Sequence, residues 1–129
     1  MALERGNLIG QFTVSTIDGT RFDYHEIWQR RNLLLVTLPS VPLSDAEQQY
    51  VSDITRHQDT FDSNETRCVV TSESIPGIAA PAVILADRWG EIYLAASGAT
   101  VAQLPNAGEI LECVRYVAHE CPECQGEAR

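Results

Sequence analysis

The architecture of this chain rests on one apolar run, Leu33-Leu34-Leu35-Val36-Thr37-Leu38. A strand with one face in water alternates apolar and polar residues, whereas an uninterrupted apolar run is typical of a strand that is covered on both faces. We therefore predict a central strand at residues 33–38. A helix packed along one face is predicted to follow from Ser44 onward, because apolar residues then recur at roughly every third or fourth position: Ala46, Tyr50, Val51, Ile54 and Phe61.

Shorter elements are predicted before and after this pair. Alternating or β-branched runs predict strands at 11–15, 67–71, 82–85 and 92–95. A short helix is predicted at 24–29, and a terminal helix that ends near Glu120 is predicted to begin after Asn106. Because a helical crossover joins parallel strands and a hairpin joins antiparallel ones, this order predicts a mixed sheet with helices on both faces.

The composition is that of one folded domain. The chain has 129 residues, of which 44% are hydrophobic and 21% charged, and this length is too short for two domains that each bury a core. The chain contains nine arginines, no lysine and 18 acidic residues, which gives a net charge of −9. We expect no binding to nucleic acid, because a phosphate backbone requires a basic surface.

The sequence also predicts where the protein is found. Its longest apolar stretch, residues 75–86, contains two prolines and is about twelve residues long, whereas a membrane-spanning helix needs about twenty. We therefore expect no membrane association. The first residues carry neither the basic start nor the apolar run of a secretory signal, so we expect a cytoplasmic protein whose four cysteines form no disulfide framework.

Four segments together resemble the thioredoxin-like superfamily and, within it, the peroxiredoxin and thiol-redoxin branch (AhpC/TSA type). They are Ile9-Gly10-Gln11-Phe12 with Asp18-Gly19-Thr20, Leu33-Leu34-Leu35-Val36, Ala80-Pro81-Ala82-Val83-Ile84-Leu85, and Asp87-Arg88-Trp89-Gly90-Glu91-Ile92. The resemblance implies a three-layer α/β/α fold with a mixed central sheet of about five strands. It divides the chain into a thioredoxin-like domain at 1–120 and a tail at 121–129.

The same resemblance implies a reactive cysteine in the loop after the strand at 33–38, where the positive end of the next helix lowers a thiol pKa. Residues 37–47 contain no cysteine. If Glu47 is aligned with the acid that follows the family's Cys-x-x-Cys motif, the two cysteine positions fall on Val41 and Ser44. Ser44 and Glu47 instead fit a capping box, and no local motif supplies a general base for Ser44.

Pro81 stands where the resemblance implies a cis proline beside the active-site loop, at the edge that holds extended peptide substrates in family members. We predict a cis bond at this position. Two interpretations stay open. Ala80, Pro81, Val41 and Ser44 form a retained surface for a protein or peptide partner, or Pro81 only sets the strand geometry.

The only conventional chemical motif is Cys121-Pro122-Glu123-Cys124. One interpretation is a redox dithiol, although the surrounding acidic residues and the negative end of the terminal helix should raise the thiol pKa. A second is structural zinc on Cys121, Cys124 and His119, completed by Cys113 or by a second subunit of a homodimer. A third is a tail without chemistry. Cys68 and Cys113 are predicted to be small core residues.

The sequence therefore predicts a thioredoxin-like protein without the usual catalytic cysteine. Its activity is either thiol-disulfide exchange through Cys121 and Cys124 or non-catalytic partner binding beside Pro81. No cofactor is expected except zinc in the second interpretation of the tail.

Overall fold

The computed structural model describes residues 4–119, which form one α/β unit. Its elements, in chain order, are β1 (Thr13–Ser15), β2 (Arg21–Asp23), the 3₁₀ helix η1 (Tyr24–Glu26), β3 (Asn32–Thr37), α1 (Asp45–Thr55), α2 (Gln58–Ser63), β4 (Thr66–Thr71), β5 (Ala82–Ala86), β6 (Ile92–Ser97), the 3₁₀ helix η2 (Val101–Gln103) and α3 (Ala107–His119). None of the helices in this part of the chain combines the length and the apolar character that crossing a bilayer requires.

The central sheet is mixed, as predicted, with the strand order β4-β3-β5-β6. Strand β3 pairs in parallel with β4 and antiparallel with β5, and β5 pairs antiparallel with β6. The sheet has four strands rather than the expected five or so. The first predicted strand is absent from it because the turn at Asp18-Gly19 folds β1 back onto β2 in a separate two-stranded sheet.

Strand β3 is buried on both faces, which confirms the prediction from its continuous apolar run. All six of its residues are buried. Leu34 and Val36 point into the core on one side of the sheet, together with Leu38, whereas Leu33 and Leu35 point into a second core on the other side. Since side chains alternate along a strand, each face of β3 needs its own covering layer.

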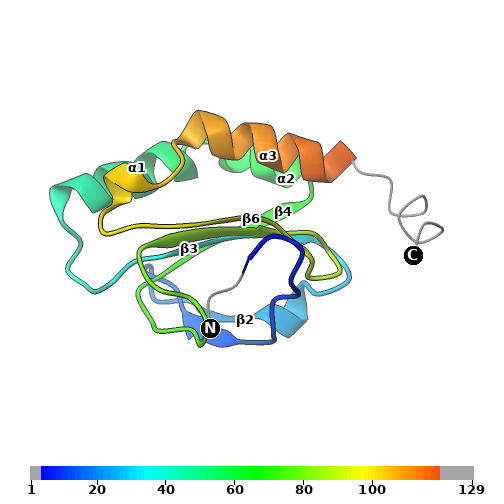
Figure 1. The fold of residues 1–129 in the computed structure, drawn as a ribbon, viewed down its shortest axis with the longest axis horizontal. Coiled ribbons are helices and arrows are strands. Elements are labelled where there is room, and N and C mark those ends of the chain that lie inside the picture. Colours follow the sequence, from blue (N-terminus) through cyan, green and yellow to red (C-terminus); the bar gives the residue numbers. More distant parts are fainter. Residues whose placement is uncertain (1–3, 120–129) are drawn as a thin grey trace.

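The two covering layers differ in kind (Figure 1). Helices α1, α2 and α3 all lie over one face of the sheet, and the β1–β2 hairpin with η1 lies over the other. The expected three layers are present, and the helical element on the hairpin side is only the 3₁₀ turn η1. The segment 72–81, which joins β4 to β5, holds Pro76, Gly77 and Pro81 and forms no helix, and only one 3₁₀ turn forms at Tyr24–Glu26.

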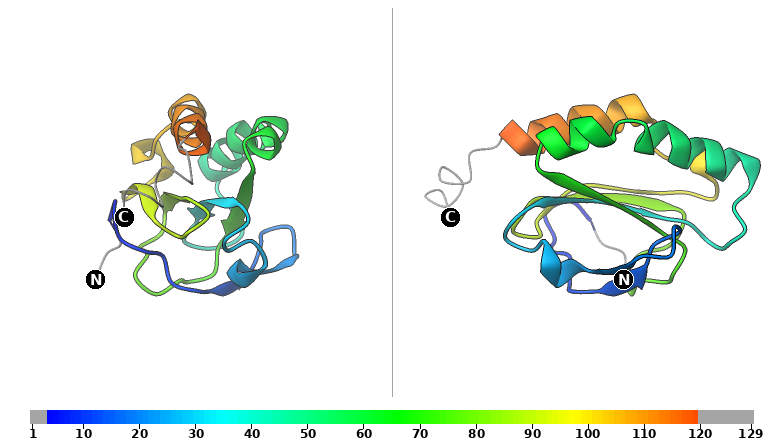
Figure 2. Two further views of the ribbon diagram at one scale, coloured as in Figure 1. Left: turned by 90° about the vertical axis from the view of Figure 1, so that its right-hand side faces the viewer. Right: turned by 180° about the vertical axis from the view of Figure 1, so that it is seen from behind.

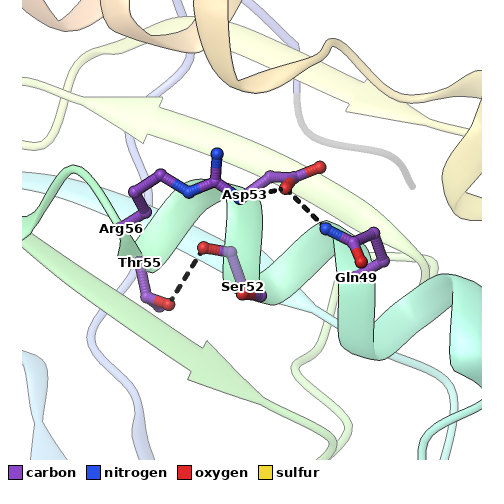
Figure 3. Close-up of polar contacts among 5 residues, drawn as sticks. All are labelled: Gln49, Ser52, Asp53, Thr55 and Arg56. Atoms are coloured by element: carbon purple, nitrogen blue, oxygen red, sulfur yellow. Dashed lines mark hydrogen bonds and ion pairs between the residues drawn. The ribbon is translucent and has the colours of Figure 1, made fainter.

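The helix predicted from Ser44 onward is divided into α1 and α2 at Arg56 and His57. Its apolar stripe packs against the sheet through Ile54 and Phe61, whereas Ala46 is exposed. Figure 3 shows polar contacts along α1. The carboxylate of Asp53 accepts a hydrogen bond from Gln49 at 2.8 Å and pairs with Arg56 at 2.8 Å, so these polar groups have partners within the helix.

Truncating β3 on either face should destabilise the protein by a similar amount. We expect Leu34→Ala, which opens the helix-side core, and Leu35→Ala, which opens the hairpin-side core, each to lower the free energy of unfolding by about 2–5 kcal/mol. Urea denaturation measures both, with Leu8→Ala as the control because Leu8 is 68% exposed. A loss for Leu34→Ala alone would show that the hairpin contributes no stable core.

Candidate functional site

The loop between β3 and α1, where the resemblance implied a reactive cysteine, ends in a helix cap. The hydroxyl of Ser44 accepts a hydrogen bond from the backbone N–H of Glu47 at 3.2 Å, and the Glu47 carboxylate accepts one from the backbone N–H of Ser44 at 2.8 Å. The capping box predicted from the sequence is confirmed. The Ser44 side chain therefore satisfies a free amide at the helix start, which is the position that would otherwise stabilise an anion.

The segment that precedes β5 lies beside this loop. The Ala80–Pro81 peptide bond is cis, as predicted, and so is Val41–Pro42. Ala80 is exposed and Pro81 is buried, while Val41 is 60% exposed. A hollow of about 230 Å³ lies between the end of β3, residues 37–39, and the loop 72–80.

Thr37 is one of the residues that line this hollow. The residue is 2% exposed, and its hydroxyl oxygen has no hydrogen-bond partner among the residues that the structure describes. Thr37 ends β3 and lies opposite Thr71 of β4 and Ala82 of β5. A buried hydroxyl without a partner is unfavourable by roughly 1–3 kcal/mol, so a group that enters the hollow and bonds to it would gain affinity.

The loop 72–80 also presents unpaired backbone. Within residues 4–119, no hydrogen bond is made by the N–H groups of Ala79 and Ala80, and both residues are exposed. Pro81 is already engaged, because its carbonyl accepts the N–H of Gly98 at 3.3 Å. Of these two residues only Ala80 lines the hollow. A free amide on an exposed, non-helical segment is a group to which an extended chain can pair.

The two cysteines that the structure describes lie elsewhere. Cys68 is half-buried on β4 and packs against the helix-side core, and burial raises its thiol pKa to about 12. Cys113 lies on α3 beside Tyr93 and Tyr116, and burial, with Glu112, raises its thiol pKa. Neither residue lines the hollow at Thr37. Both packing positions agree with the prediction of small residues at the core.

The tail motif lies outside the described residues. Cys121 and Cys124 are beyond residue 119, so the redox and zinc interpretations stay predictions. His119, the third predicted zinc ligand, ends α3 with its Nδ1 atom 2.8 Å from the carbonyl of Arg115. Within residues 4–119, no group of three or more His, Cys, Asp or Glu side chains is placed to hold a metal ion.

Thr37 was not identified from the sequence as a site residue. A signal was available, since it is the polar residue within the apolar run of a strand predicted to be buried on both faces. A buried threonine usually bonds to backbone, as Thr66 does with the carbonyl of Asn64 at 3.1 Å. Only the packing shows that the Thr37 hydroxyl lacks such a partner.

Comparisons with solved structures identify the fold. The reduced 2-Cys peroxiredoxin of Plasmodium vivax is 12% identical, with a TM-score of 0.71 over 95% of this chain and 84% of that one. A thioredoxin-family thiol:disulfide interchange protein of Chlorobium tepidum is 12% identical, with a TM-score of 0.64 over 91% and 99%. A peroxiredoxin-like protein of Aquifex aeolicus is 14% identical, with a TM-score of 0.63 over 91% and 89%.

No protein-family model and no curated protein sequence matches the chain. At these identities the structural matches establish a thioredoxin-like fold of the peroxiredoxin type, as the sequence predicted. Function must then be argued from the site itself, because one fold hosts many activities.

Removing the cap hydroxyl should affect stability. We expect Ser44→Ala to lower the free energy of unfolding by about 1 kcal/mol, because the N–H of Glu47 loses its acceptor. The control is Ser52→Ala, since Ser52 is an exposed residue inside α1 and its change should stay within about 0.5 kcal/mol. Urea denaturation distinguishes the two, and an unchanged stability of Ser44→Ala would contradict a structural role for this hydroxyl.

Proposed function

We propose that this thioredoxin-like chain is a partner-binding module, which holds an extended peptide segment in the hollow beside Pro81 and carries out no thiol chemistry there. One observation carries the proposal. Ala80, whose backbone N–H is free, lines the same hollow as Thr37, whose hydroxyl has no partner, and neither of the two cysteines that the structure describes lines it.

Main-chain pairing accounts for the loop groups. An extended peptide offers carbonyl oxygens at regular spacing, and one of them can accept the N–H group of Ala80. The family resemblance supports this mode of binding, because redox members hold extended substrates at the edge beside the corresponding proline. The exposed side chain of Val41, on the neighbouring loop, supplies apolar surface for the same segment.

Thr37 supplies selectivity in this proposal. Thr37 lines a hollow of about 230 Å³, which suits a single small polar side chain of the partner, and its buried hydroxyl can donate or accept a hydrogen bond. The exposed residue Glu73 also lines the hollow, and its carboxylate accepts the N–H of Ser15 at 3.0 Å. A partner segment with a hydroxyl or amide side chain at this position fits the polar floor.

Among the described residues, none at this site is placed to act as a nucleophile. The Ser44 hydroxyl accepts the N–H of Glu47, and a serine nucleophile additionally requires a positioned base. A thiol with a pKa of about 12, such as that of Cys68, is almost entirely protonated near neutral pH and is a poor nucleophile. The residues that the structure describes at this site can bind a partner, but they supply no reactive group.

Selection from random peptides tests the proposal. A phage-displayed heptapeptide library is panned against the protein, and a selected peptide is titrated into ¹⁵N-labelled protein. We expect amide shifts to concentrate at residues 37–39 and 72–80. The double variant Cys121→Ser/Cys124→Ser should bind the same peptide with unchanged affinity. Loss of binding by that variant, or shifts that map elsewhere, would show that the binding site proposed here is wrong. Loss of binding would in addition support the redox interpretation of the tail.

The Thr37 hydroxyl should favour binding and disfavour folding. We expect Thr37→Val to raise the free energy of unfolding by about 1 kcal/mol, since an unsatisfied buried group is removed, and to weaken binding of the selected peptide. The matched control is Thr66→Val, which is equally buried but loses a bond to the carbonyl of Asn64 and should be destabilised. Urea denaturation and calorimetric titration measure both effects. A destabilised Thr37→Val variant would mean that its hydroxyl is already bonded.

A further inference from the structure

A second and smaller hollow, of about 60 Å³, lies between the loop 72–80 and the β5–β6 pair. Ile78 and Ala79 of the loop line it, together with Ile84 of β5 and Ala95 of β6. Figure 2 shows that the segment between β4 and β5 lies on the side of the sheet opposite the helices, where Ile78 packs against the hairpin-side core. The loop therefore forms a wall over the far end of this face of the sheet.

Small side chains form the floor of this second hollow. Ile84 and Ala95 are direct partners in the β5–β6 register, and Ala82 and Ser97 form the next pair on the same face. Ile84 and Ala95 belong to the hairpin-side core, so the floor lies on the hairpin side of the sheet. Ser97 is exposed and lines the hollow. The hollow is therefore a recess that can be reached from solvent.

The loop places this recess beside the hollow at Thr37. Ile78 lines both hollows, whereas Ala79 lines only the smaller one and Ala80 only the larger one. Both alanines are exposed, and their N–H groups make no hydrogen bond within residues 4–119. Successive side chains of an extended peptide point to opposite sides. Two adjacent residues of a peptide bound along this loop can therefore direct one side chain to each hollow.

The size and lining of the recess limit what can enter it. A cavity of about 150 Å³ accommodates the six carbon atoms of benzene, so a hollow of about 60 Å³ accommodates two or three carbon atoms. The side chains at positions 78, 79, 82, 84 and 95 are all apolar. A short apolar side chain such as that of alanine or valine fits this space, and an aromatic one does not.

We propose that this recess, the Ala95 subsite, binds an alanine or valine side chain of the same partner peptide that enters the hollow at Thr37. The Ala95 subsite rests on the function proposed above and specifies which segments the site binds. The partner carries two adjacent residues, one with a hydroxyl or amide side chain for the Thr37 hollow and one with a short apolar side chain for the Ala95 subsite. The free N–H groups of Ala79 and Ala80 bind its main chain.

Filling the recess tests the subsite. Ala95→Val adds two carbon atoms, which occupy most of the space, and β-branched residues are well tolerated in strands. The probe is a heptapeptide selected by phage display on the unmodified protein. We expect calorimetric titration to show that Ala95→Val weakens its binding about tenfold, because the short apolar side chain of the peptide is no longer buried. Ala99→Val is the matched control, since Ala99 is exposed and lines neither hollow, and circular dichroism verifies that both variants are folded.

A change in the peptide identifies the side chain that enters the recess. Replacing its alanine or valine by glycine removes the group that the subsite binds. We expect the glycine peptide to bind the unmodified protein more weakly than the selected peptide does, and to bind Ala95→Val with the same affinity as the unmodified protein. This pattern is the coupling that a double-mutant cycle measures between two groups in contact. Independent effects of the two changes would overturn the proposal.

The sequences of the selected peptides and their amide shifts separate this subsite from the function on which it rests. We expect alanine or valine next to serine, threonine, asparagine or glutamine, and shifts at Ala95 and Ser97 in addition to residues 37–39 and 72–80. Shifts confined to 37–39 and 72–80, a consensus without the adjacent pair or an unchanged affinity of Ala95→Val would overturn the subsite alone. Shifts that avoid 37–39 and 72–80 would contradict the proposed function itself.

Discussion

The burial of β3 on both faces is the constraint from which the rest of the structure follows. Leu33 and Leu35 point to one side of the sheet and Leu34 and Val36 to the other, and none of the four is exposed. Exposing either pair to water would lower the free energy of unfolding by several kilocalories per mole, because each Å² of buried apolar surface contributes about 25 cal/mol. The chain must therefore build two covers. The helices supply one, and the N-terminal hairpin with its 3₁₀ turn supplies the other.

The binding site proposed beside Pro81 lies where one of these covers ends. At the end of β3, the hairpin-side layer gives way to the loop 72–80, and the Thr37 hydroxyl is left beside a hollow. A compact hairpin covers less of a sheet than crossover helices would. A ligand gains the most binding affinity where it supplies a hydrogen-bond partner to an unsatisfied polar group at the margin of a core.

The helix start that follows β3 shows how one scaffold can serve different chemistry. In a redox protein of this fold, the positive end of that helix stabilises a thiolate. Here the same end is satisfied internally by Ser44 and Glu47, and the described cysteines lie on β4 and α3, where burial raises their thiol pKa. The geometry of the fold is retained although its usual reagent is absent from this loop. Structural similarity at 10–14% identity accordingly identifies the fold, while the residues decide the activity.

The sequence alone determined the features that depend on local pattern. A continuous apolar run meant a strand covered on both faces, and Ser44 with Glu47 meant a helix start, because both signals need only neighbouring residues. Tertiary packing decided the rest. Periodicity reports that a face is buried but not which segment buries it, so the hairpin cover and the four-stranded sheet could not be predicted. The division of the long helix at Arg56 and the unpaired hydroxyl of Thr37 depend on residues far apart in the chain, and no local sequence pattern shows that these residues meet.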